Sequence, residues 1–221
     1  MPIPLPLLAR VTLLFCALGA LAPAHATSVT VVNPGFEDPA VASEPYWLSS
    51  APGWTIAGAA GTFNPVAGEL TPVSQVAWSN GEAGSGTLTQ APLSAQVTAD
   101  TRYTLTVDIG WRMDVPPLFP PFPGFTVELL AGTSVLASQP SMQAPTPGQF
   151  LLYTLVYDVL PGNPLIGEAL GIRLGANGVQ VNFDNVALDA SPVPLPAPLV
   201  LLGSAIGLAT SLFGRRRQKA A

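Results

Sequence analysis

The side chains that most often perform catalysis are nearly missing from this sequence. It contains one cysteine, one histidine and one lysine (Cys16, His25 and Lys219), and all three lie close to a chain end. Residues 27–190 therefore offer no thiol nucleophile, no Ser-His-Asp triad, no imidazole or thiolate metal site and no disulfide. The acid–base chemistry that remains is that of carboxyl groups, in a glycosidase-type pair or in a hard-cation site.

Positive charge is also scarce in the central part of the chain. Residues 27–190 hold all 13 acidic residues and only three arginines, Arg102, Arg112 and Arg173, which gives them a net charge of −10. Proteins bind nucleic acids largely through cationic contacts with phosphates. The composition therefore excludes nucleic acid as a partner.

Hydrophobic residues are concentrated at the two ends of the chain. At the N-terminus, Arg10 precedes the apolar run 11–22, and the small residues Ala24 and Ala26 flank His25. This order is typical of a cleaved signal peptide. We expect residues 1–26 to be removed on export.

The C-terminal end has three parts in a fixed order. A proline-rich linker, residues 191–198, precedes the apolar run 199–214 and a basic tail, residues 215–221. The apolar run is just long enough to be a transmembrane helix. Under the positive-inside rule the basic cluster of the tail stays cytoplasmic, so residues 27–190 are expected outside the membrane; the cluster is Arg215, Arg216 and Arg217.

The linker carries a proline motif, Val193, Pro194, Leu195, Pro196 and Ala197. Together with the short apolar run and the arginine cluster, it resembles the PEP-CTERM sorting signal of Gram-negative bacteria, in a variant where Leu195 replaces the usual glutamate. The resemblance implies processing by an exosortase, passage through the inner membrane, and a place at the cell surface or in a biofilm or exopolysaccharide matrix. An ordinary single-pass anchor is the alternative.

The central region has the pattern of an all-β protein. Residues 102–112 alternate strictly between apolar and polar side chains, and shorter runs around Val127 and Ile172 do the same, which is typical of half-buried strands. Residues 150–159 are apolar in both phases and predict a central strand covered on both faces. The pattern changes phase at Asp184, which predicts a β-bulge there. These features favour a β-sandwich.

Three short motifs refine this fold prediction. Residues 33–37 (NPGFE), 88–90 (LTQ) and 183–186 (FDNV) resemble those of the galactose-binding-like jelly rolls found in carbohydrate-binding modules. In such modules the first Glu and the last Asp often meet at a structural calcium ion. The resemblance implies Glu37 and Asp184 as calcium ligands, the alternative being that Glu37 faces solvent and Asp184 only shapes the bulge.

Sugar-binding modules hold their ligands by stacking them on exposed aromatic rings. Tyr46 and Trp47 lie in a proline-flanked segment, and Trp78 precedes an Asn-Gly turn, so these three are the candidate ligand-binding residues. Trp54 and Trp111 continue strand patterns and are expected in the core.

The sequence thus predicts a jelly-roll-like β-sandwich that is exported, sorted to the surface and non-catalytic. Its expected role is that of a matrix or adhesion component, with extracellular polysaccharide as its candidate ligand and calcium as its candidate ion. Two alternatives are a carboxylate-dependent glycan hydrolase and a purely structural matrix protein without a discrete ligand.

Overall fold

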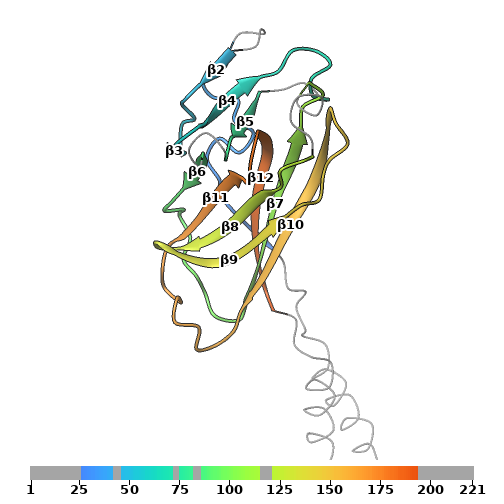
Figure 1. The fold of residues 1–221 in the computed structure, drawn as a ribbon. Helices are drawn as coiled ribbons and strands as arrows, with labels where there is room; N and C mark the ends of the chain where they lie inside the picture. Colours follow the sequence, from blue (N-terminus) through green and yellow to red (C-terminus); the bar gives the residue numbers. More distant parts are fainter. Residues whose placement is uncertain (1–25, 42–45, 72–74, 82–85, 115–120, 194–221) are drawn as a thin grey trace, which may run out of the picture.

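The computed structural model describes residues 26–41, 46–71, 75–81, 86–114 and 121–193. These residues form two antiparallel sheets that pack face to face (Figure 1). The seven-stranded sheet has the order β10-β7-β12-β5-β4-β2, and β1 pairs with the second half of β12. Its strands are β1 (Thr27–Val29), β2 (Tyr46–Leu48), β4 (Ala60–Asn64), β5 (Val76–Ser79), β7 (Thr101–Trp111), β10 (Gln149–Val159) and β12 (Val181–Pro192).

The second sheet has five strands in the order β3-β6-β11-β8-β9. Its strands are β3 (Thr55–Ala57), β6 (Thr87–Gln90), β8 (Phe125–Ala131), β9 (Ser134–Ser141) and β11 (Leu170–Ala176). The prediction of an all-β sandwich is confirmed, and the arrangement is consistent with a jelly roll. Within the described ranges, no helix is long and apolar enough to cross a membrane.

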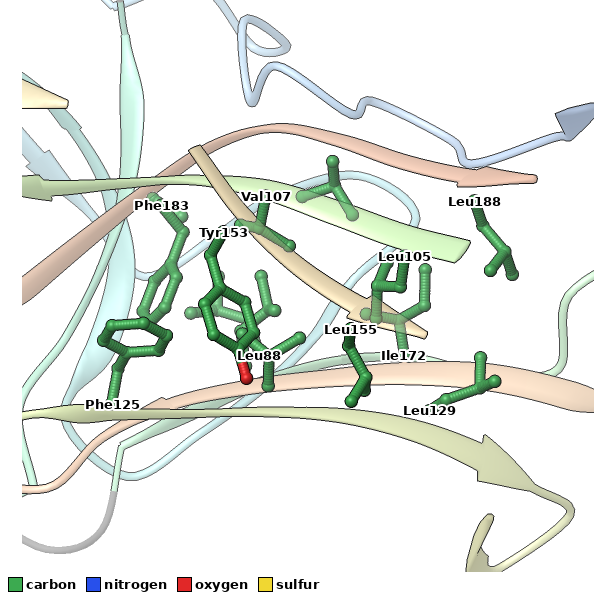
Figure 2. Close-up of a cluster of buried hydrophobic side chains, with 14 of the residues drawn as sticks. Leu88, Leu105, Val107, Phe125, Leu129, Tyr153, Leu155, Ile172, Phe183 and Leu188 are labelled. Atoms are coloured by element: carbon green, nitrogen blue, oxygen red, sulfur yellow. The ribbon is translucent and has the colours of Figure 1, made fainter. Parts of the chain in front are cut away.

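The main core fills the space between the two sheets. Alternate residues of the facing strands point inward, and most of the side chains labelled in Figure 2 are almost fully shielded from solvent. Phe125 from the five-stranded sheet packs edge-to-face on Tyr153 from the seven-stranded sheet, with ring centroids 4.9 Å apart. Burial raises the pKa of the Tyr153 hydroxyl above its ordinary value of 10.0. Trp54 and Trp111 are core residues, as their strand phases predict.

The prediction for residues 150–159 is wrong in one respect. They form most of β10, which is an edge strand of the seven-stranded sheet and not a central one. On its inward face Tyr153, Leu155 and Val159 are buried, whereas Leu152 and Val156 on the outer face are 65% and 49% exposed. Apolar residues in both phases therefore reflect an unusually apolar outer surface, which the sequence pattern alone does not distinguish from burial on both faces.

The predicted bulge lies in β12. The register of β12 against β7 shifts between Asp184 and Ala187, and Asn185 adopts a left-handed backbone with φ = 49°. Before the shift, β12 pairs with β5; after it, the same edge of β12 pairs with β1. The bulge therefore marks the place where the chain's opening segment joins the sheet.

Candidate functional site

A second hydrophobic cluster lies outside the main core, on the outer face of the seven-stranded sheet. Phe63 of β4, Val76 of β5 and Leu70 are fully buried there, and Trp78 of β5 and Phe150 of β10 pack against them. The outer face of a sheet in a small sandwich is usually polar. An apolar and aromatic cluster at this position is therefore a candidate binding surface.

Residues 65–71, here called the strap, cover one end of this cluster. Leu70 of the strap is a buried member of the cluster, and Glu69 of the strap forms an ion pair with Arg112, with 3.2 Å between the guanidinium and the carboxylate. The guanidinium of Arg112 lies 4.5 Å from the ring centroid of Phe63 and also pairs with Asp114. This cation stacks on the aromatic cluster and ties the strap to the end of β7.

Two rows of side chains cross the sheet beside the cluster. In the first row, the register aligns Trp78 of β5, Asn182 of β12, Gly110 of β7 and Phe150 of β10. In the second row, two residues further along each strand, Asp184 of β12 lies opposite Asp108 of β7, and Leu152 follows on β10. Two residues of a strand span roughly 7 Å, so a ligand on the first row lies within reach of the carboxyl groups on the second.

Asn185 joins the two carboxyl groups of the second row. Its backbone N–H donates to Asp184 Oδ1 at 2.8 Å, and its side-chain amide donates to Asp108 Oδ2 at 3.0 Å. Asp184 is only 4% exposed, whereas Asp108 is half-buried. Of the two, Asp108 is therefore the carboxyl group that a ligand on this face can touch.

Glu37 also lies near Asp184. Both flank Gly35: a methyl group on Gly35 would be 3.5 Å from Asp184 Oδ1, 3.8 Å from Glu37 Cγ and 4.0 Å from Asn185 Oδ1. We call Glu37, Asp184 and Asn185 the acidic corner. It supplies oxygen donors only, the chemistry that a hard cation such as Ca²⁺ prefers. No cluster of three Asp, Glu, His or Cys side chains suited to a metal occurs in the described ranges, so any further ligands there would be amide, backbone or water oxygens.

The structure places the three predicted aromatic ligand residues along the same sheet. Trp78 is half-buried beside the second cluster. Tyr46 and Trp47 belong to β2, and Trp47 takes the register position opposite Phe63; their side chains lie outside the described part of the structure. The prediction of an exposed stacking platform is untested for all three.

The outer face of the five-stranded sheet differs in chemistry. It carries a hollow of about 380 Å³ lined by hydroxyl, amide and glycine residues around one ion pair. That pair joins Arg173 of β11 to Glu128 of β8, which lie opposite each other in the ladder. Among the described residues that line this hollow, the two charged side chains pair with each other.

Comparison with known proteins identifies the family. The HpiC1-like model, described as HpiC1 cyclase, matches residues 27–189, which cover both sheets and both outer faces. The chain belongs to the HpiC1-like cyclase family. A search of curated proteins found no match.

Solved structures agree with this assignment. The chain is 32% identical to the Stig cyclase Fisc from Fischerella sp. TAU, in complex with (3Z)-3-(1-methyl-2-pyrrolidinylidene)-3H-indole, over 77% of this chain and 100% of that one, with a TM-score of 0.66. A Fischerella sp. TAU cyclase in complex with 4-(1H-indol-3-yl)butan-2-one is 31% identical over 76% of this chain and 100% of that one, with a TM-score of 0.65.

Membership in a cyclase family corrects the functional prediction from the sequence. The expectation of a non-catalytic matrix or adhesion protein that binds polysaccharide is wrong, because the matched region, residues 27–189, is that of an enzyme family. The absence of cysteine, histidine and lysine from this region is compatible with an enzyme, because carboxyl groups alone can perform acid–base catalysis.

The recognition of a PEP-CTERM protein is likewise overturned, and with it the expected exosortase, membrane and cell-surface partners and location. It rested on a short C-terminal pattern that carries no information about the chemistry of the matched region, which the cyclase family covers. Residues 1–25 and 194–221 lie outside the described residues. These include the predicted signal peptide up to His25, the predicted transmembrane segment, Arg215, Arg216 and Arg217, and every residue of the proline motif except Val193.

Sequence reasoning missed several residues that shape this site. No sequence pattern singles out Phe63 and Phe150 as ligand contacts, and Asn182 stands between two core residues, Val181 and Phe183. One signal was available for Asn182: a polar residue in the outward phase, two positions before Asp184, lies on the same face of the strand.

Proposed function

We propose that this chain catalyses the acid-initiated cyclisation of a small, largely apolar molecule that contains an aromatic ring of the indole type. The observation that carries the proposal is the presence of aromatic rings and an accessible carboxyl group on one sheet face of a chain in the HpiC1-like cyclase family. Relatives with about a third of their residues identical bind indole compounds in their crystal structures, which supports the choice of substrate class.

The second hydrophobic cluster is the proposed substrate surface. Trp78 and Phe150 offer ring faces for stacking, and Phe63 with Leu70 forms the apolar base. An apolar surround excludes water, and excluding water protects a cationic intermediate from being trapped as an alcohol. The aromatic faces also stabilise positive charge through their quadrupoles.

Asp108 is the proposed catalytic acid. Its carboxyl group donates a proton to a carbon of the substrate; a new carbon–carbon bond then closes the ring onto the cationic centre, and the product returns a proton to the carboxylate. The reaction is an isomerisation, since no atom is gained or lost. Asn185 donates to Asp108 Oδ2 and orients the group.

Product formation tests the proposal. The purified protein is incubated with indoles whose 3-substituent ends in an alkene, and the mixtures are examined for a product of unchanged mass and altered retention time. We expect conversion by the wild type, and a rate about 10²–10⁴-fold lower for Asp108→Asn, the usual range for the loss of a general acid.

Glu128→Gln is the matched control, because Glu128 is a half-buried carboxylate on the other sheet, in a salt bridge with Arg173. Its rate should stay close to that of the wild type. Absence of conversion across the panel, or equal losses in Asp108→Asn and Glu128→Gln, would contradict the proposal.

We further propose that the acidic corner binds a structural Ca²⁺ ion through Glu37 and Asp184. The fit rests on the position of Gly35, whose missing side chain leaves the oxygens of Asp184 and Asn185 facing the same space as Glu37. Bound there, calcium would offset the mutual repulsion of the two carboxylates and fasten the opening segment of the chain to β12. Asp184 then has a structural role, and Asp108 keeps the catalytic one.

Thermal unfolding with Ca²⁺ and with a chelator tests the calcium site. Ligand binding to the folded state raises the unfolding midpoint. When free Ca²⁺ is at a hundredfold excess over its Kd, the added free energy of unfolding is roughly 2.7 kcal/mol. We expect this rise in the wild type and in the control Glu168→Gln, whose side chain is exposed, and its loss in Glu37→Gln. An unchanged wild-type midpoint would rule out the site. Loss of turnover in Asp184→Asn with an intact calcium response would exchange the roles of Asp184 and Asp108.

A further inference from the structure

The opening segment, residues 30–41, brings Glu37 to the acidic corner without forming a strand of its own. It is tied to β12 through the backbone N–H of Val186, which donates to the carbonyl of Pro34 at 3.0 Å. Buried backbone groups that lie outside a strand ladder need partners from side chains, turns or water. The side chains that supply such partners therefore decide where Glu37 lies.

Gln75 supplies these partners on both sides of Glu37. This residue directly precedes β5 and is only 3% exposed. Its Nε2 donates to the carbonyl of Phe36 and, at 3.0 Å, to the carbonyl of Pro39, while its Oε1 accepts from the N–H of Val41 at 2.8 Å. Both hydrogens of the amide are thus used. The chain from Phe36 to Pro39, which includes Glu37, wraps around this one side chain.

The backbone just before Glu37 is strained. Phe36 has φ = 56°, in the left-handed region that residues other than glycine avoid. Its ring is fully buried and lies 5.1 Å from that of Trp54, measured between centroids. A strained conformation persists only where its surroundings hold it. The hydrogen bond from Gln75 to the Phe36 carbonyl therefore fixes the direction in which the chain continues to Glu37.

The sheet places Gln75 next to the acidic corner. Ala77 of β5 pairs with Phe183 of β12, and continuing this ladder by two residues brings Gln75 level with Asn185, in the bulge. We infer that Gln75 is a positioning residue for calcium, which holds the Glu37 carboxylate where one cation can bind it together with Asp184. This inference rests on the proposed calcium site and adds the residue that shapes it. Gln75 acts through the backbone around Glu37.

Gln90 of β6, on the other sheet, is a matched control. It is 4% exposed, and its side chain also holds the opening segment. Its Nε2 donates to the carbonyl of Val32, and its Oε1 accepts from the N–H of Val32, both at 2.8 Å. Val32 precedes the strained turn, so Gln90 anchors the segment without bracketing Glu37. Comparing the two glutamines separates the positioning of Glu37 from general anchoring.

Calorimetric titration of the full, calcium-stripped chain with CaCl₂ tests the inference. Gln75→Met and Gln90→Met keep an unbranched side chain of similar length and remove the amide. The Kd for Ca²⁺ should rise about 10–100-fold in Gln75→Met, the usual effect of losing a group that orients a metal ligand. In Gln90→Met it should stay close to the wild-type value. Both variants should melt below the wild type in chelator, because each leaves backbone groups of the opening segment unpaired.

The wild type alone provides a second measurement, by NMR. Coupling between two events is reciprocal, so Ca²⁺ should slow the hydrogen exchange of the Gln75 side-chain amide and leave that of Gln90 unchanged. This measurement decides the question if Gln75→Met does not fold. An unchanged Kd in Gln75→Met, equal rises in both variants, or equal exchange effects at both glutamines would overturn the inference and leave the calcium site standing. Absence of Ca²⁺ binding by the wild type would overturn the site and the inference together.

Discussion

The two outer faces of the sandwich use similar residues in different ways. On the five-stranded sheet, Arg173 lies opposite Glu128 in the ladder and neutralises it. On the seven-stranded sheet, Asp108 lies opposite Asp184, another carboxyl group. Asn185 donates to both, from its backbone N–H to Asp184 and from its side-chain amide to Asp108. The first face has no remaining charge to offer a ligand from this pair, whereas the second concentrates acid groups beside aromatic rings.

This difference separates a face whose charged residues favour stability and solubility from a face whose polar groups favour chemistry. Cross-strand pairs of opposite charge stabilise a sheet, and like charges directly opposite weaken it. The Asp108–Asp184 pairing is therefore unfavourable for the fold alone, and so is the buried amide of Asn182. Groups that cost stability and lie beside an apolar surface are typical of functional sites.

The largest difference in stability should come from the two arginines. The Arg112 side chain is 9% exposed and stacks on Phe63 while pairing with Glu69; the Arg173 side chain is 37% exposed. Arg112→Met leaves a mostly buried carboxylate unpaired and should cost about 2–3 kcal/mol, whereas Arg173→Met should cost under about 1 kcal/mol. Urea unfolding of both variants measures this. Equal losses of unfolding free energy in the two variants would contradict the distinction between the two faces.

A pair of glycines gives an intermediate effect. Gly110 and Gly175 occupy outward positions on central strands of the two sheets. A methyl group on Gly110 would lie 2.8 Å from Phe150 Cε1, but one on Gly175 would meet its nearest atoms at 3.5 Å. Gly110→Ala should cost about 1–2 kcal/mol and weaken indole binding, and Gly175→Ala should be neutral or slightly stabilising. Thermal unfolding distinguishes them; a neutral Gly110→Ala would show that Phe150 moves freely.

The smallest effect concerns an ion pair at the far end of the seven-stranded sheet. Hydrogen bonds from Arg102 hold the pKa of the Asp158 carboxyl below its ordinary value of 3.8. A depressed pKa in the folded state adds stability that is complete above the unfolded pKa and disappears as the pH falls through the folded pKa. Both side chains are about a third exposed, so the contribution is small.

Asp158→Asn should therefore melt slightly below the wild type at pH 7, with the two midpoints converging below about pH 4. Melting curves between pH 3 and pH 7 measure the difference. A gap that widened on acidification would contradict the assigned direction of the pKa shift.

Much of the fold could be predicted from the sequence, because burial on one face produces alternation. β7 alternates over its whole length and is buried on its inward face, and the phase change at Asp184 marks the observed register shift. The pattern fails where a second layer covers the sheet. Ala60–Asn64 (β4) shows no alternation because the strap and the second cluster bury its outer face as well. β10 fails in the opposite sense, since its apolar outer residues are exposed.

The site could be predicted only in fragments. A resemblance in short motifs implied that Glu37 and Asp184 meet, and both do flank Gly35; whether they bind calcium stays a prediction. The row that joins Trp78 to Asn182 depends on the pairing of β5 with β12, about a hundred residues apart in the chain, and no local pattern contains that register. The enzyme class could not be predicted, because catalysis by carboxyl groups requires no motif of Cys, His or Lys that the sequence would show.

A crystal structure of the protein with 4-(1H-indol-3-yl)butan-2-one tests the account most directly, because it shows which outer face holds the ligand. The account predicts the indole ring stacked against Trp78 and Phe150, with its 3-substituent directed toward Asp108. An indole bound instead in the hollow beside Arg173 and Glu128, with the seven-stranded face unchanged, would contradict it.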